Sequence, residues 1–159
     1  MIVKKSSIVV VLLLVLFPLI SWLYLKNGIS FRKNALTELS NKEAFDFSIL
    51  KELSIDDYKE KIVLIDIEGK SDNTQNIYNQ FKESNDFKII SSDKRYQLEI
   101  SNETLEILKT EYNNAYLLID NEGYLRNKYE NTDTDMKKAV VHIATLIPFV
   151  EKKKPRGIK

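Results

Sequence analysis

The chain has 159 residues and no cysteine, which excludes disulfides, thiol catalysis, iron–sulfur clusters and cysteine zinc sites. Its only histidine is His142, so a multi-histidine metal site is excluded as well. The formal net charge is +1, yet residues 46–150 hold 13 basic and 20 acidic side chains, a net of −7. Because nucleic-acid binding needs a clustered positive face, this acidic body argues against a nucleic-acid partner.

An uncharged, mostly apolar run opens the chain. It extends from Ser6 to Leu25, about the twenty residues that a membrane-spanning helix needs. Trp22 and Tyr24 stand at its far end, where amphipathic rings favour the lipid headgroups. Bulky residues follow the run where a signal peptidase requires small ones, so we expect an uncleaved anchor. Basic residues flank both ends of the run, and the positive-inside rule does not fix its orientation.

A βαβ unit is predicted after the anchor. A short helix over 32–39 and a short strand around Phe45 and Phe47 come first. The continuous apolar run 61–67 is typical of a strand buried on both faces. Helical spacing over 74–83 and a short strand at 87–90 follow, which predicts two parallel strands joined by a right-handed crossover.

A helix, a hairpin and a last helix are predicted in the second half. An extra strand at 96–100 precedes a helix that Ser101 or Asn102 caps. The strands 115–120 and 124–129 flank a tight turn, and Thr132 or Asp133 caps a last helix that we expect to end at Pro148. This order predicts an α/β fold, a thioredoxin-like mixed sheet with flanking helices, preceded by one N-terminal transmembrane helix.

The predicted hairpin carries a family resemblance. Residues 116–126 read YLLIDNEGYLR, which resembles the C-terminal hairpin of the Sco/SenC family, the thioredoxin-like copper-insertion proteins of cytochrome c oxidase. Asn131-Thr132-Asp133 and the amphipathic helix after it are also similar to that family. The likeness covers about residues 46–66 and 115–147. It implies an N-terminal anchor, an exported thioredoxin-like fold and a role close to cytochrome oxidase.

The family's copper ligands are missing from this chain. Laid on this sequence, the Cys-x-x-x-Cys and the histidine of the family fall on Asp72, Asn76 and Tyr112. Copper is selected by soft ligands, and none of these three residues offers one. The sequence therefore predicts a degenerate member that binds no copper. We expect no enzymatic activity, no catalytic residue, no cofactor and no metal site.

Four carboxylates are the candidates for a weak cation site. Glu68, Asp72, Asp120 and Glu122 lie at or beyond the carboxyl ends of predicted core strands, where open α/β sheets bind ligands. Such groups could hold Mg²⁺ or Ca²⁺, although Asp-Asn-Glu-Gly is also ordinary turn chemistry. His142 lies off the apolar stripe of the last helix, and we expect it to face solvent.

The leading hypothesis is a non-catalytic, membrane-anchored protein that acts by protein–protein contact. The resemblance implies an accessory subunit or assembly factor of cytochrome oxidase or a respiratory complex, with a single pass through the cell inner membrane and a periplasmic domain. The alternative is a metal-binding or small-ligand protein, or an enzyme, that uses the cleft at the sheet end. The predicted parts are a cytoplasmic tail (1–5), a transmembrane anchor (6–25), a juxtamembrane connector (26–45), a thioredoxin-like domain (46–150) and a basic tail (151–159).

Overall fold

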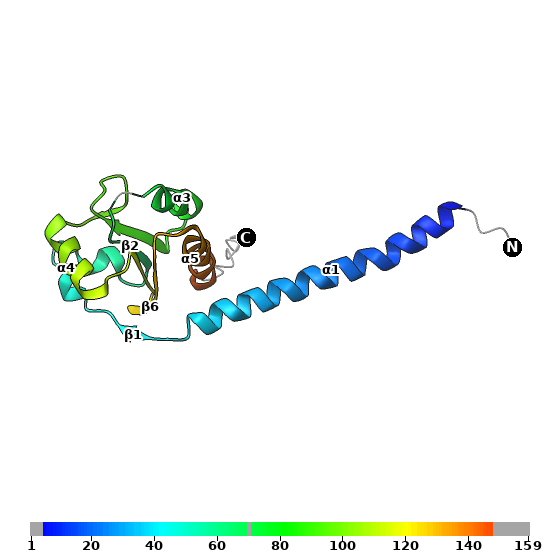
Figure 1. Ribbon diagram of the computed structural model, residues 1–159, viewed down its shortest axis with the longest axis horizontal. Helices are drawn as coiled ribbons and strands as arrows, with labels where there is room; N and C mark the ends of the chain where they lie inside the picture. Colours follow the sequence, from blue (N-terminus) through cyan, green and yellow to red (C-terminus); the bar gives the residue numbers. More distant parts are fainter. Residues whose placement is uncertain (1–4, 70, 148–159) are drawn as a thin grey trace, which may run out of the picture. The chain divides into compact units, whose positions relative to one another are not determined.

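The computed structural model describes residues 5–69 and 71–147 (Figure 1). The chain forms two compact units, Met1–Thr37 and Glu38–Lys159. The predicted basic tail, and the expected helix end at Pro148, lie outside the described residues.

The first unit is built from helix α1, Lys5–Glu38. Its stretch Leu13–Glu38 is long and apolar enough to cross a membrane, and large apolar side chains are exposed along it. Both features are compatible with a membrane anchor. The helix does not break after Leu25, and the predicted helix over 32–39 is largely its continuation. A single glycine, Gly28, separates these parts, which is too little to end a helix.

The second unit contains a mixed six-stranded sheet in the order β1-β6-β5-β2-β3-β4. Strands β2, β3 and β4 run parallel, while β5 is antiparallel to β2, and β6 is antiparallel to both β5 and β1. The predicted βαβ unit and hairpin are therefore confirmed. The strands are β1 (Glu43–Ala44), β2 (Ile62–Asp66), β3 (Phe87–Ser91), β4 (Leu98–Glu99), β5 (Tyr116–Ile119) and β6 (Tyr124–Tyr129).

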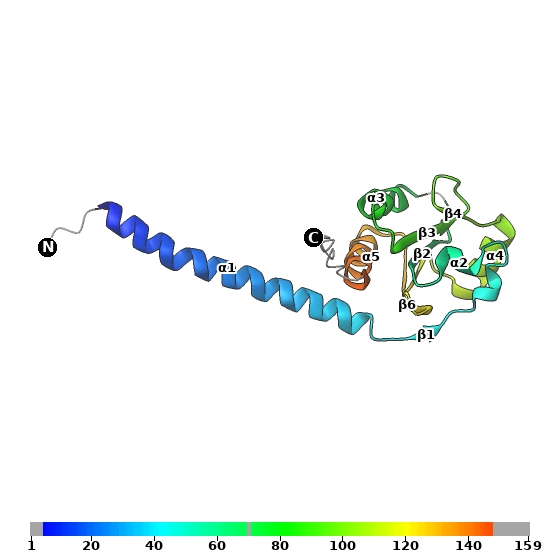
Figure 2. The same cartoon turned by 180° about the vertical axis from the view of Figure 1, so that it is seen from behind.

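Helices cover both faces of this sheet (Figures 1 and 2). Helices α3 (Asp72–Phe81) and α5 (Asp133–Leu146) pack against one apolar core. Helix α4 (Asn102–Tyr112), the short helix α2 (Ile55–Tyr58) and the 3-10 turn η1 (Phe47–Ile49) border the other core. The N-caps of α3, α4 and α5 are Ser71, Ser101 and Thr132, whose hydroxyl groups accept backbone N–H bonds.

Strand β2 is the centre of the domain. All five of its residues are buried, the four apolar ones as their pattern predicts, and Asp66 with them. Ile62 and Leu64 belong to the core beneath α3 and α5, whereas Val63 and Ile65 belong to the core beneath α4. Successive side chains of a strand point to opposite faces, so β2 contributes to both cores.

The predicted strand around Phe45 and Phe47 is wrong. The ladder with β6 ends at Ala44, and Phe47 begins the 3-10 turn η1. The cause is Asp46, whose carboxylate accepts the N–H of Ser48 at 2.9 Å and so offers the backbone an alternative to a strand ladder. Phe47 then stacks flat on Tyr58, with 4.7 Å between ring centroids.

The hairpin that carries the family resemblance is held by its own charged residues. The carboxylate of Asp120 accepts the backbone N–H groups of Glu122 and Tyr124, both at 2.9 Å. It also forms an ion pair with Arg126, whose Nε lies 2.5 Å away. The side chain of Asp120 is 2% exposed and that of Arg126 is 15% exposed. Arg126 also donates to the carbonyl of Leu39 at 2.8 Å. These residues therefore fix the turn and tie the start of the second unit to it.

Candidate functional site

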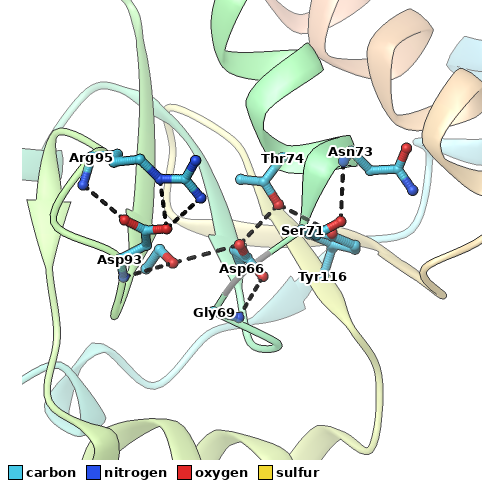
Figure 3. A network of polar contacts seen from close by, with 9 residues as sticks. Asp66, Gly69, Ser71, Asn73, Thr74, Asp93, Arg95 and Tyr116 are labelled. Atoms are coloured by element: carbon cyan, nitrogen blue, oxygen red, sulfur yellow. Dashed lines mark hydrogen bonds and ion pairs between the residues drawn. The ribbon is translucent and has the colours of Figure 1, made fainter.

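The candidate site is a network of polar side chains at the carboxyl end of β2 (Figure 3). Asp66 ends this strand, and its side chain is fully buried. Its carboxylate accepts the N–H of Gly69 at 2.9 Å and the hydroxyl of Thr74 at 2.8 Å. The loop to α3 can fold back in this way because Gly69 has φ +82°, which strains other residues, and an added Cβ would lie 2.6 Å from Ser92 Oγ.

Neighbouring strands extend the network on both sides of Asp66. The Thr74 hydroxyl lies 3.1 Å from the Tyr116 hydroxyl on β5. Ser91, at the end of β3, donates to Asp66 at 3.5 Å and accepts the N–H of Asp93 at 3.2 Å. Asp93 in turn holds Arg95 through two N–H bonds of 2.8 and 2.6 Å. Three strands and the first turn of α3 therefore position one connected set of polar groups.

Asn131 closes the network at the surface. Its side-chain oxygen accepts bonds from Asn73 at 2.9 Å and from Ser71 at 3.3 Å. Its amide nitrogen donates to the carboxylate of Glu68. The loop after β2 and the segment before α5 are thus fastened to one another over the end of the strand.

Burial sets the electrostatics of the network. Desolvation raises the pKa of Asp66, against the opposing effect of the Gly69 and Thr74 hydrogen bonds, and the nearby charge of Glu68 raises it further. Desolvation also raises the pKa of Tyr116. Burial therefore favours the neutral forms of Asp66 and Tyr116.

The hydroxyl of Tyr96 is a buried polar group without a hydrogen bond to any described residue. Tyr96 is 6% exposed and lies in the segment between β3 and β4. Desolvation raises its pKa, the Arg95 charge lowers it, and the charges of Asp66 and Asp93 raise it. Sequence reasoning missed this hydroxyl, because no local motif marks a tyrosine whose hydroxyl becomes buried.

The three positions of the family's copper ligands do not meet. Asp72 and Asn76 are exposed residues of α3. Tyr112 ends α4 and packs against the core on the other face of the sheet, where it stacks on Phe45 with 5.8 Å between centroids. Desolvation, with the charge of Glu111, raises the pKa of Tyr112 to about 12. A common site for these three residues is therefore excluded by the sheet that separates them.

The four carboxylate candidates are also separated. Because β5 runs antiparallel to β2, the carboxyl ends of the two strands point to opposite ends of the sheet. Asp66 is paired with Tyr116, and Val63 is paired with Ile119. Glu68 and Asp72 come after the carboxyl end of β2, while Asp120 and Glu122 come after the carboxyl end of β5. Glu122 pairs with Lys42 at 2.6 Å. In the described part of the chain, no group of three or more histidine, aspartate or glutamate side chains could hold a metal ion.

The expectation that His142 faces solvent is wrong, since it is 2% exposed. Its Nδ1 lies 2.8 Å from the Tyr129 hydroxyl and 3.3 Å from Asn127 Nδ2, and its Nε2 lies 3.4 Å from a Glu38 carboxylate oxygen. The amide of Asn127 is oriented by Lys128 N–H, which donates to its oxygen at 2.9 Å. Its nitrogen therefore faces His142, which favours the neutral tautomer with the proton on Nε2.

Comparisons with protein-family models, with curated protein sequences and with solved structures gave no match to this chain.

Asp66→Asn tests the electrostatics of the network. We expect this variant to be at least as stable as the wild type at neutral pH, because it removes a disfavoured charge and keeps an acceptor for Gly69. Asp66→Ala should lower the free energy of unfolding by about 1–3 kcal/mol, because Gly69 and Thr74 lose their acceptor. The pKa of folded Asp66 lies above 3.8. The stability of the wild type relative to Asp66→Asn should thus fall as pH rises from 3.8 through the folded-state pKa.

Calorimetry of the full chain in mild detergent, repeated over pH, measures these differences. If the difference in free energy of unfolding between the wild type and Asp66→Asn does not change with pH, the raised pKa of Asp66 is contradicted.

The ring of His142 should titrate below its ordinary pKa of 6.5, because burial and the Lys138 charge outweigh the attraction of Glu38. Since the chain has one histidine, its ring NMR signal is unambiguous. We expect Glu38→Gln to lower the pKa further and Lys138→Gln to raise it. The neutral ring should make stability fall as pH falls from 6.5 through the folded-state pKa. A wild-type midpoint at or above 6.5 would refute this description.

Proposed function

We propose that the chain is a membrane-anchored, thioredoxin-like protein that acts by protein–protein contact rather than by catalysis. The family resemblance suggests an accessory or assembly role for cytochrome oxidase or a wider respiratory complex. In this proposal α1 spans the inner membrane once, and the second unit lies in the periplasm. The Sco/SenC resemblance, and not the charge pattern, is the source of that orientation.

The order of elements supports the thioredoxin-like part of the proposal. Strands β2 and β3 with α3 form a parallel βαβ unit, β5 and β6 form a hairpin beside β2, and α5 follows. Helices α3 and α5 contribute to the same core. Strands β1 and β4 extend this arrangement at the two edges of the sheet.

The observation that carries the proposal is the way the polar groups at the carboxyl end of β2 satisfy one another. Ligands of open α/β sheets bind beyond such strand ends. Here the carboxylate of Asp66 is bonded to Gly69 and Thr74, and Asn131 fastens the loop at the surface. The chain also has no thiol for redox chemistry. A closed structural network at this place favours a role for the outer surfaces of the domain.

The experiment is purification of the tagged full-length chain in mild detergent. We expect subunits of an oxidase or another respiratory complex to co-purify, and their retention to weaken as salt rises, because the domain is acidic. Asp66→Asn is the matched variant, which should retain the partner because the network is structural in this proposal. A C-terminal alkaline phosphatase fusion should be active if the domain is periplasmic.

A chain that purifies alone, and whose deletion leaves oxidase activity unchanged, would disprove the respiratory partner. Loss of the partner in a folded Asp66→Asn variant would instead assign the network a direct role.

A second candidate function is the binding of a hard cation at the Asp66 network. The observation that favours it is the buried hydroxyl of Tyr96, which has no hydrogen bond to a described residue and whose pKa the charges of Asp66 and Asp93 raise. In this case Mg²⁺ or Ca²⁺ should raise the thermal midpoint of the wild type and leave that of Asp66→Asn unchanged. An equal shift in both proteins, or no shift, would rule this function out.

A further inference from the structure

A cavity opens at the end of β2 opposite to Asp66. Its volume is about 380 Å³, and it lies between α2, the start of β2 and the hairpin turn. Its walls are mainly apolar and come from Phe47, Tyr58, Val63 and Ile119. Hydrophobic pockets of this kind bind apolar groups that would otherwise be exposed to water.

The cavity is held open by well-packed walls. The ring of Phe47 stacks on that of Tyr58 with an interplanar angle of 4°. On its other side Phe47 meets the hairpin turn, where a Cβ added to Gly123 would lie 3.3 Å from the ring. Gly123 has φ +88°, so the close approach and the backbone conformation both favour glycine.

An exposed apolar side chain stands on the rim of the cavity. Ile55, the first residue of α2, is 65% exposed and also contributes to the lining. It is the most exposed large apolar residue in the described part of the second unit, ahead of Ile107 and Tyr124. A projecting isoleucine and an apolar hollow therefore lie side by side on one surface.

The charges on the rim also come in both signs. Lys59 and Glu60 are adjacent, exposed, and without an ion pair to any described residue. The other three charged rim residues are already paired. Lys61 lies 3.7 Å from Asp86, Glu122 lies 2.6 Å from Lys42, and Asp120 lies 2.5 Å from Arg126. Glu60 also has φ +60°, a left-handed conformation that costs a non-glycine residue about 1 kcal/mol or more.

We infer that this surface binds a second copy of the same chain through a two-fold axis. The Ile55 side chain of each protomer enters the cavity of its partner, and Lys59 of each faces Glu60 of the other. A two-fold interface requires one patch to be complementary to itself. This patch meets the requirement twice. It carries both a projection and a hollow, and it carries a cation and an anion that pair with no described residue.

This inference is independent of the proposed respiratory partner. A self-associating domain can lack that partner, and a chain that binds the partner can be monomeric. The two experiments therefore fail separately.

The test is the mass of the full-length chain in mild detergent, by light scattering over a range of concentrations. We expect a dimer, and Ile55→Asp should raise its dissociation constant at least ~10-fold, the effect of losing a buried isoleucine contact. Ile107→Asp is the matched control and should leave the dimer intact. Lys59→Glu should weaken the dimer, while the double variant Lys59→Glu with Glu60→Lys should restore it.

A thermal midpoint for each variant shows that it is folded. A monomeric wild type overturns the inference, as does a dimer that Ile55→Asp leaves unchanged, since α1 or another surface would then hold it together. A monomer whose cavity carries an apolar small molecule, seen by native mass spectrometry, also overturns it. Disulfide formation between a Lys59→Cys chain and a Glu60→Cys chain would support it directly, because the natural chain has no other thiol.

Discussion

The burial of a carboxyl group at the end of the central strand is the constraint on which the rest of this domain depends. Strand β2 is enclosed on both faces, so Asp66 cannot reach water. A buried polar group is costly unless it is hydrogen-bonded. The left-handed Gly69, the Thr74 hydroxyl in the first turn of α3 and the Ser91 hydroxyl at the end of β3 all supply bonds to it. Meeting this requirement fixes the loop between β2 and α3, and with it the register of the helix on the sheet.

The two ends of β2 have opposite physical characters, and this contrast guides the functional interpretation. At the carboxyl end, polar side chains from three strands bond mainly to one another, and Asn131 binds the covering loop. At the amino end, the stacked rings of Phe47 and Tyr58 border an apolar hollow with Ile55 exposed beside it. Polar groups that already bond to one another are less open to a substrate, whereas an open apolar surface gains free energy by contact. This is why we favour interaction surfaces over catalysis.

The β5–β6 hairpin, which carries the family resemblance, contains residues that stabilise the turn and hold the chain before β1. Asp120 bonds the backbone of its own turn and pairs with Arg126, and Arg126 holds the carbonyl of Leu39. The positions of that family's copper ligands hold residues that the sheet keeps apart. In this chain the hairpin pattern therefore serves turn geometry and chain anchoring.

The sequence by itself determined the elements whose signal is local. The continuous apolar run of β2, the glycine turn of the hairpin and the caps Ser101 and Thr132 are set by side-chain periodicity and short-range hydrogen bonds, and they were predicted within a few residues. Only the tertiary structure decided which residues meet. Because β5 runs antiparallel to β2, the carboxylates that follow β2 lie far from those that follow β5. The packing of α5 on β6 buries His142 against Tyr129. Asp46 replaces a predicted strand with a turn, and the cavity beside Ile55 joins residues from segments far apart in the chain. These outcomes depend on long-range contacts, whose energies a local pattern does not contain.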